Sequence, residues 1–501
     1  MSIIHRPPVK AKDYIVPAAK AVFVPTTEES IPFNAAIRQT DPMDLSEYGY
    51  VEEEYLVSGE ANVYSMGPRR GDTTYIKAEN CPYTDRILVR KPENPKAFSG
   101  TVLVELMNYA FFMDNPQAGW GALHEYLLPR GDAWVGLTIR DSAITALKRF
   151  DEQRYSSLRI PNPVPTEERG TIGIAYNFNV DPDSENGLFY DITSQVGALI
   201  KSGGEDSPFK GYEVRYTYVT GASAGDLTTY AGFVHNYAKL PGGKPVYDGI
   251  QIFMTGAPAN LNNEERNVLA PDPLCIIDSC VPTFRVLTLG DMLGKGGHPD
   301  WSYMQRREES NDPVYRIYET SGASLGIRTD RDTMMDRAGV EKIGGRWFEK
   351  RHNLPYHAFA MQYVLRATFD ALKKYCEFGI LPPKSRLLET TGNYPDVDFV
   401  LDEYGNVKGG VRSAFVDVPI ASYEPNGKIN PFSKEKLREL YGTHAEYVKR
   451  IAENCEKHIK EGFLLAEDAM TMIQYALEFN IDDDVFLDNM EGITGSSTYG
   501  M

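Results

Sequence analysis

The residue with the clearest chemical potential in this sequence is Ser223, at the centre of the segment GASAG over 221–225. The segment matches G-x-S-x-G, in which a serine occupies a sharp turn between a strand and a helix. EVRYTYVT, before it, is typical of a strand, and LTTYAGFVHNYA, after it, is typical of a helix. Small neighbours suit such a turn. The context predicts a nucleophilic serine, and the alternative is a small-residue turn needed only for packing.

A nucleophilic serine needs groups that stabilise the oxyanion formed during acyl transfer. The N-terminus of the following helix favours negative charge, so the backbone N–H of Ala224 is one expected donor. The second donor is expected in the loop after the strand GTVLVELM, at Asn108 and Tyr109. Asn108 could equally cap a turn.

The serine also needs a base and an acid to orient that base. Asp291 ends the predicted strand TFRVLTLGD and is the candidate acid, although an aspartate there could equally cap the following turn. No histidine follows the next strand, YRIYETSGASLG. His357 is therefore the first candidate base, followed by His352 and then His298, and a lone histidine is more often structural than catalytic.

The composition excludes some classes of function. The chain has 501 residues, 42% of them hydrophobic, and a net charge of −18. Ordinary hydrophobic content predicts a sizeable core, and the excess of carboxylates disfavours nucleic acids and anionic membranes. A small molecule is the expected partner, and the 31 tyrosines would suit an aromatic one. The sequence leaves the oligomeric state open.

The N-terminal residues and the number of cysteines indicate the cellular compartment in which the protein is expected. The first residues contain no apolar stretch with a cleavage site, and no segment resembles a membrane span. Five cysteines, an odd and sparse set, predict reduced thiols in a cytoplasmic protein. Cys275 and Cys280 could pair or bind a metal, but no second cysteine pair completes a zinc site, so both are expected to be buried thiols.

Strand-like and helix-like segments alternate along most of the chain, which predicts an α/β fold with a largely parallel central sheet. The expected strands lie at 55–66, 84–92, 100–108, 133–140, 213–221, 247–256, 283–291 and 315–322. The expected helices lie at 119–131, 191–202, 224–240, 357–379, 434–460 and 465–479.

The same pattern suggests three parts of the chain. Residues 1–54 are expected to form an irregular extension, 55–390 the core, and 391–501 a hairpin and helices packed on the core. Residues 141–190 interrupt the alternation and are expected to form a lid-like insertion over the site.

The sequence resembles the large α/β-hydrolase-domain family, whose elbow commonly reads G-E-S-Q-S-A before a helix with L-T-T-Y and V-H. The resemblance covers about 81–480 and includes GASAGDLTTYAGFVHNY and VPTFRVLTLGDMLG. It implies an α/β-hydrolase fold and serine hydrolysis without a cofactor, through an acyl-Ser223 intermediate. Carboxylic esters are the first substrate class that it suggests.

Two departures from the family pattern affect the expected chemistry. Family members often read T-E-T-D where this chain has TLGD, ending at Asp291. They read W-E-V-A-G-x-x-H where this chain has Leu325 in place of the histidine. A serine without a base is a poor nucleophile. The open alternatives are a lyase or isomerase on the same fold, and a ligand-binding pseudoenzyme.

Overall fold

The computed structural model describes residues 14–66, 74–109, 113–170, 181–222, 225–254, 259–264, 278–292, 306, 308–323, 333–345, 347, 360–393, 396–424, 429–478 and 480–482. The chain divides into two compact units. Unit 1 comprises Met1–Thr283 and Asp330–Phe348, and unit 2 comprises Phe284–Thr329 and Glu349–Met501.

Unit 1 is built on a sheet with the strand order β9-β7-β5-β6-β4-β3-β2. The strands are β2 (Lys20–Val24), β3 (Tyr50–Met66), β4 (Thr74–Pro92), β5 (Thr101–Leu106), β6 (Ala133–Leu137), β7 (Tyr216–Ala222) and β9 (Gly249–Phe253). Neighbours among β6, β5, β7 and β9 are parallel, whereas β4, β3 and β2 are added antiparallel. Strands β5, β6 and β9 are buried along their whole length, as expected where helices cover both faces of a parallel sheet.

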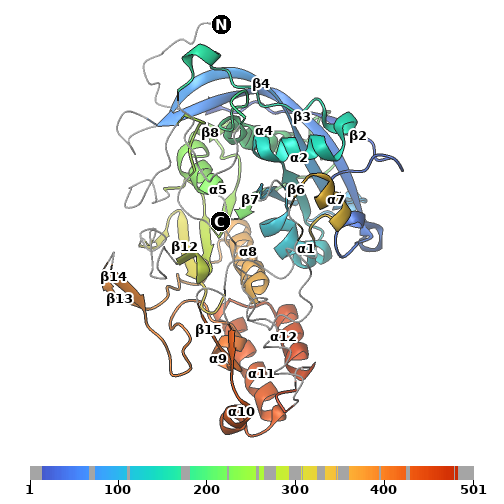
Figure 1. Ribbon diagram of the computed structural model, residues 1–501. Helices are drawn as coiled ribbons and strands as arrows, with labels where there is room; N and C mark the ends of the chain where they lie inside the picture. Colours follow the sequence, from blue (N-terminus) through green and yellow to red (C-terminus); the bar gives the residue numbers. More distant parts are fainter. Residues whose placement is uncertain are drawn as a thin grey trace. The chain divides into compact units, whose positions relative to one another are not determined.

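All helices of unit 1 but the last lie between these strands along the chain, and the last belongs to the segment Asp330–Phe348 (Figure 1). They are α1 (Ala122–Leu127), α2 (Asp141–Phe150), α3 (Glu152–Tyr155), α4 (Leu188–Ser202), α5 (Gly225–Thr229) and α7 (Arg337–Lys342). Two π-helical segments, η5 (Gln117–Gly121) and η8 (Tyr230–Val234), precede α1 and follow α5. Short 3-10 turns are η1 (Ala36–Arg38), η2 (Leu45–Tyr48), η3 (Pro95–Ala97), η6 (Leu128–Arg130) and η7 (Thr166–Glu168).

Buried hydrogen bonds fix helix α4 on strand β3. The carboxylate of Asp191 accepts the N–H of Asn62 at 2.9 Å and the hydroxyl of Tyr64 at 2.8 Å. All three side chains are buried, so this polar contact is protected from water and gives the helix a defined register on the strand.

A buried ion network ties the long β3–β4 hairpin to the rest of unit 1. The guanidinium of Arg86 on β4 contacts Glu54 Oε1 on β3 at 2.5 Å and Asp114 Oδ2 at 2.9 Å. Glu54 also contacts Arg154 of α3 and accepts the hydroxyl of Tyr155 at 2.8 Å. Arg86, Glu54 and Asp114 are fully buried or nearly so, and such charges persist only when each has partners.

Unit 2 contains strands β10 (Thr283–Leu287), β11 (Ser310–Asn311) and β12 (Val314–Glu319) in the order β11-β12-β10, with Thr283 at the unit boundary. Two small antiparallel pairs are β13 (Thr390–Asn393) with β14 (Asp396–Phe399) and β15 (Ala421–Tyr423) with β16 (Ile429–Pro431). The helices are α8 (Ala360–Phe378), α9 (Ala414–Asp417), α10 (Lys434–Tyr441), α11 (His444–Glu461) and α12 (Ala466–Glu478), and a 3-10 turn, η10, spans Gly290–Met292. Helices α9 to α12 share one apolar core, which includes Phe415, Leu437, Ile451 and Met472.

The predicted α/β class, with a parallel centre of the sheet flanked by helices, is confirmed in unit 1. Three local predictions were wrong. The region 1–54 is not irregular throughout, because β2 pairs with β3, and β1 (Tyr14–Ile15) pairs with β8 (Ala238–Lys239). The helix expected at 224–240 ends in the π-helical segment η8 and gives way to β8.

The third error concerns the helix expected at 434–460. It is interrupted at Gly442, which has φ of 70°, and Thr443 then caps α11. With a positive φ, Gly442 lies outside the helical conformation, so the hydrogen-bond ladder of α10 ends there.

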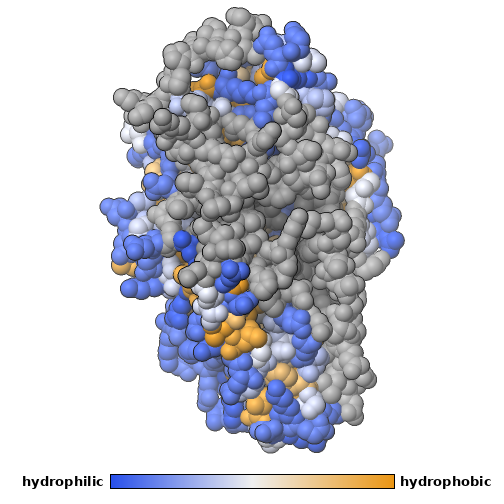
Figure 2. Space-filling view, turned by 60° about the vertical axis from the view of Figure 1, so that its left-hand side comes forward, coloured by the Kyte–Doolittle hydropathy of each residue, from blue (hydrophilic) through white to orange (hydrophobic). Residues whose placement is uncertain are grey.

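The described surface is mostly polar. Figure 2 shows a face on which the described residues are mostly hydrophilic, with smaller hydrophobic patches. Among the described residues, none of the helices is long and apolar enough to cross a membrane.

Candidate active site

Asn108, Tyr109 and the end of β7 lie at the carboxyl edge of the unit 1 sheet. Strand β5 has β6 on one side and β7 on the other, so the chain changes direction across the sheet between these two neighbours. In open α/β sheets, ligands bind outside the carboxyl ends of the strands at such a switch point. The segments after Leu106, Leu137 and Ala222 all leave the sheet at this edge.

The nucleophile motif spans the junction between β7 and α5. Strand β7 ends at Ala222 and helix α5 begins at Gly225. Ser223 and Ala224 themselves lie outside the described residues. A Cβ on Gly221 would meet Leu106 at 3.5 Å, which is an ordinary contact. A larger side chain would therefore fit at position 221, although small neighbours of Ser223 were expected to be needed for lack of room.

The loop after β5 is closed by Asn108. Its N–H donates to the carbonyl of Asn115 at 2.8 Å, and its side-chain amide donates to Gln117 Oε1 at 2.8 Å. The backbone N–H of Asn108 is therefore already hydrogen-bonded to Asn115. These two bonds are of the kind expected if Asn108 caps a turn, which was the alternative interpretation. Tyr109 follows, with only 7% of its surface exposed.

A buried ion pair joins the segment after β6 to the helix after the nucleophile motif. The Arg140 guanidinium contacts the Asp226 carboxylate in the first turn of α5. Asp226 is fully buried, and the side chain of Arg140 is 13% exposed. Burial would lower the pKa of Arg140, but the Asp226 carboxylate outweighs it and the pKa lies above its usual value. A carboxylate in a first helical turn is also favoured by the helix dipole.

Aromatic rings and a strained backbone complete the surroundings of Arg140. Its guanidinium carbon lies 5.5 Å from the ring centroid of Tyr109 and 4.8 Å from that of Phe189. Its φ is 75° and its ψ is 148°, a region that is almost restricted to glycine. Such a conformation costs on the order of 1–3 kcal/mol and persists when the surroundings impose it. The ion pair with Asp226 and the two rings therefore fix the conformation of Arg140 at the edge where β7 ends.

Glu105 supports the same region from within the sheet. Its carboxylate on β5 accepts the N–H of Trp120 at 2.8 Å and the indole N–H of Trp134 at 2.9 Å. Burial raises the pKa of Glu105 to about 7, although hydrogen bonds from Gly119, Trp120 and Trp134 oppose the shift. A Cβ on Gly119 would lie 2.5 Å from Glu105 Oε2, so only glycine fits there.

Asp291 lies in unit 2, on the turn η10 after β10. Its Oδ2 accepts the N–H of Thr288 at 2.7 Å and the hydroxyl of Thr288 at 2.9 Å. These bonds are those of a turn-capping aspartate. Its role as the acid that orients a base stays a prediction.

The candidate bases His357, His352 and His298 lie outside the described residues, as does Leu325. The histidines within the described ranges have structural partners. His124 Nδ1 lies 2.8 Å from the carbonyl of Trp120, and His235 Nε2 accepts the N–H of Tyr247 at 3.1 Å. His444 Nδ1 accepts the N–H of Ile481 at 3.5 Å.

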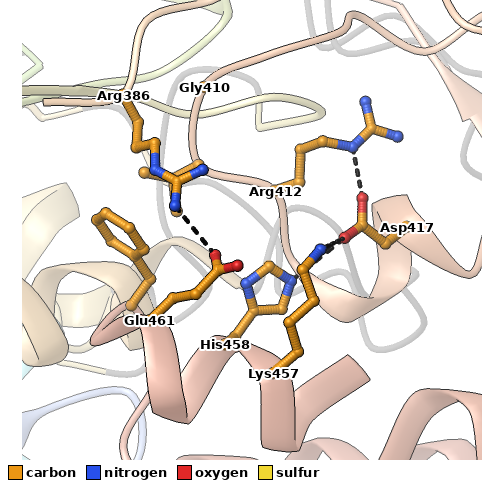
Figure 3. Close-up of a pocket in the computed structure, with 9 residues that line it drawn as sticks. Arg386, Gly410, Arg412, Asp417, Lys457, His458 and Glu461 are labelled. Atoms are coloured by element: carbon orange, nitrogen blue, oxygen red, sulfur yellow. Dashed lines mark hydrogen bonds and ion pairs between the residues drawn. The ribbon is translucent and has the colours of Figure 1, made fainter. Parts of the chain in front are cut away.

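A small cavity in unit 2, of about 80 Å³, is lined by charged side chains (Figure 3). Arg412 contacts Asp417 at 2.6 Å, Arg386 contacts Glu461 at 3.3 Å, and His458 Nε2 lies 3.4 Å from Asp417. No serine, threonine or cysteine is among the described residues that line it. Cations and carboxylates compensate one another there, which indicates a structural ion cluster rather than a catalytic centre.

A hollow of about 310 Å³ in unit 1 includes Tyr50, Asn94 and Leu128 in its walls. Asn94 precedes β5 and Leu128 precedes β6, so the hollow lies at the amino ends of these strands, opposite the edge where β7 ends. In the described part of the chain, no three His, Cys, Asp or Glu side chains gather in a way that could hold a metal ion.

Comparison with known proteins identifies the family. Residues 16–474 match the family described as "Alpha/beta hydrolase domain", and the chain belongs to this family. A search of curated proteins finds no match.

Solved structures with some similarity include a protein assigned as a dienelactone hydrolase from Klebsiella pneumoniae, with 11% identity and a TM-score of 0.28 over 58% of this chain and 95% of that one. Another is the esterase Est22, with 11% identity and a TM-score of 0.29 over 67% of this chain and 84% of that one. At such TM-scores we draw no conclusion from these two structures.

Sequence reasoning missed Arg140, Asp226 and Glu105. The signal for Arg140 was available, because it stands directly after the strand AWVGLTI, where the carboxyl edge is expected. The signal for Asp226 was its place three residues after Ser223, at the start of a helix. Nothing in the sequence showed that the two residues meet, because 86 positions separate them.

Proposed function

We propose that this protein is a serine-dependent hydrolase that cleaves carboxylic esters through an acyl-Ser223 intermediate. The observation that carries the proposal is the junction at the sheet's switch point, where G-x-S-x-G joins the end of β7 to the start of α5. Membership of the alpha/beta hydrolase domain family supports it.

In the proposed reaction, the Ser223 hydroxyl oxygen attacks the ester carbonyl carbon while a base accepts its proton. The proposed oxyanion donors are the N–H groups of Ala224, Asn108 and Tyr109, of which that of Asn108 already donates to the carbonyl of Asn115. The alcohol leaves with the proton, and water then cleaves the acyl-enzyme by the same steps. His357 is the first candidate base, with His352 and His298 as alternatives, and Asp291 is the candidate acid.

Buried aromatic rings surround Arg140 near the junction. Tyr109 and Phe189 flank its guanidinium, and the rings of Phe189 and Tyr190 lie 4.0 Å apart. A small and aromatic substrate is proposed from the tyrosine-rich composition alone. In the proposal the Arg140–Asp226 pair fixes the first turn of α5, so that the serine before it keeps its orientation.

A second candidate function rests on Leu325. The family pattern has a histidine at this position, and its loss favours a ligand-binding pseudoenzyme, or a lyase or isomerase on the same fold. Such a protein would keep the fold without an activated serine.

The deciding experiment is labelling with a fluorophosphonate, read by peptide mass spectrometry. The variants are Ser223→Ala, His357→Ala, His352→Ala and His298→Ala. The matched controls are Ser207→Ala and His444→Ala, both outside the proposed chemistry. Circular dichroism checks that each variant is folded.

Ester hydrolysis predicts labelling at Ser223 that disappears in Ser223→Ala and in one of the three histidine variants, but not in the controls. A well-folded wild-type protein that takes no label at Ser223 would refute the proposal and favour the second candidate.

A further inference from the structure

Helix α12 of unit 2 carries apolar side chains on two adjacent sides. One side is buried in the core of unit 2 and includes Ala469 and Met472. The neighbouring side carries Met470, which is 73% exposed, and Leu477, which is 53% exposed, with the partly buried Ile473 between them. We call these last three residues the outer face of α12. Apolar side chains exposed on one side over successive helical turns indicate a surface that another segment covers.

The chain after α12 is fixed close to the start of α11, which lies beside α12 (Figure 1). The buried Ile481 donates its N–H to Nδ1 of His444, the first residue of α11, at 3.5 Å. Asp482 contacts Arg438 of α10 at 3.6 Å. Residues 483–501 continue from this anchor and lie outside the described residues, and unit 2 contains both them and α12. This last part of the chain therefore starts near the C-terminal end of α12.

The apolar residues after this anchor have the same spacing as the outer face. Read from the C-terminal end of α12, the outer face has a step of four residues and then a step of three. Phe486, Met490 and Ile493 repeat these steps in the direction away from the anchor. Steps of four and three place side chains on one side of a helix. A helical segment that runs back along α12 would place Phe486 opposite Leu477 and Ile493 opposite Met470.

The lengths of the two segments agree as well. From 470 to 477 and from 486 to 493 there are seven residue steps each, which is about 10 Å at the helical rise of 1.5 Å per residue. Residues 479–485 remain for the connection, and neighbouring helices are commonly joined by about 2–8 residues. A second copy of the chain is a less suitable occupant of the outer face, because two molecules with a net charge of −18 repel each other.

We propose that the outer face of α12 is a docking surface for residues 485–493 of the same chain, which run back along the helix in the antiparallel direction. The short tether gives this segment an effective concentration of about millimolar order at the outer face. Docking removes Met470 and Leu477 from water, together with the apolar side chains of the segment, and this burial of apolar area favours the contact. Docking within unit 2 is independent of the proposed hydrolysis.

The test is disulfide cross-linking in the full-length chain. Met470→Cys is combined with Ile493→Cys, and the control combines Thr471→Cys with Ile493→Cys, because Thr471 is exposed and turned by about 100° from Met470 around the helix. Native cysteines that could compete are replaced by serine. They are Cys280, which is exposed and not buried as expected, the partly exposed Cys376, and Cys275, which lies outside the described residues. Diamide is the oxidant, non-reducing electrophoresis separates monomers from dimers, and peptide mass spectrometry measures the rate of each link.

We expect Met470→Cys and Ile493→Cys to link within one chain roughly tenfold faster than the control pair. Rates within about twofold of each other, or links that form between two chains, would overturn the proposal. Hydrogen exchange tests it without new cysteines, because Phe486→Ser should make the amides of 470–477 exchange roughly tenfold faster than in wild type. Leu381→Ser, at another exposed apolar position, should leave their exchange unchanged. Unchanged exchange in folded Phe486→Ser would overturn the proposal equally.

Discussion

The Arg140–Asp226 pair makes a sharp prediction about the stability of unit 1. Asp226→Asn keeps the size and most hydrogen-bonding capacity of the side chain but removes its charge. The guanidinium of Arg140 then keeps its positive charge, 13% exposed, beside an uncharged partner. The first turn of α5 also loses a carboxylate that the helix dipole favours.

The magnitude follows from the burial of the two side chains. Removing one partner of a fully buried ion pair costs roughly 3–5 kcal/mol. Arg140 keeps some contact with water and the faces of Tyr109 and Phe189, so we place the loss of unfolding free energy at the lower end, about 3 kcal/mol. The strained backbone of Arg140 would then lack the contact that offsets its cost.

The assay is a double-mutant cycle in urea unfolding, followed by tryptophan fluorescence and far-UV circular dichroism. Its variants are Asp226→Asn, Arg140→Met and the double replacement. We expect a coupling energy of about 2 kcal/mol or more, because each single variant leaves the other charge buried. The control is Asp183→Asn, whose pair with Arg169 spans 2.7 Å but is 79% exposed at Asp183. That control should change stability by less than about 0.5 kcal/mol.

A coupling energy below about 0.5 kcal/mol would show that solvent or other groups compensate the charges. The role given to Arg140 in holding α5 would then be withdrawn, whatever the protein's activity.

Three further predictions concern other parts of the fold. The Glu105 carboxyl has a folded-state pKa of about 7, above the ordinary 4.5, so the wild type loses stability as pH increases between about 5 and 8. Glu105→Gln lacks this titration, and its stability relative to wild type should rise over that range by roughly 3 kcal/mol in all. Parallel pH profiles from urea unfolding would contradict this. Gly119→Ala should lower the free energy of unfolding by about 2 kcal/mol, because the added Cβ would overlap Glu105. The matched control Gly204→Ala, whose added Cβ would have its nearest atom at 3.5 Å, should lower it by less than about 1 kcal/mol. Equal melting temperatures of the two variants would contradict this. Asp417→Asn should destabilise unit 2 by about 2 kcal/mol near pH 7. The difference should persist down to about pH 4 and shrink only under more acidic conditions, because, despite the opposing effect of burial, His458 and Arg412 hold the pKa of Asp417 far below its ordinary value, and the stabilisation is lost only as pH falls through that lowered pKa. A pH-independent difference in hydrogen exchange of α11 down to the most acidic conditions would argue against it.

Local sequence patterns predicted the elements whose hydrophobic character is complete within a few residues. Strands β5, β6, β7 and β9 were expected because each is a short apolar run that ends in turn residues. The junction at Ser223 was expected for the same reason, since strand, small-residue turn and helix are adjacent in the chain.

Features that depend on distant partners could not be predicted in this way. Strand β2 is defined by its pairing with β3, whose partner residues lie 30 or more positions later along the chain. The exposure of Cys280 depends on how its loop meets the segment after η8, although its composition resembles that of a buried stretch. Arg140 and Asp226 each look like ordinary surface charges until the fold brings them together.

The buried network of Arg86, Glu54, Asp114 and Arg154 constrains how this sequence can change over time. Each charge is satisfied by groups from a different segment, so a single neutral replacement leaves a buried, uncompensated ion. Viable descendants must exchange several positions almost together, or pass through variants of much lower stability. We therefore expect these four positions to vary as a set in related sequences, and a relative with one apolar replacement to carry compensating apolar replacements at the others.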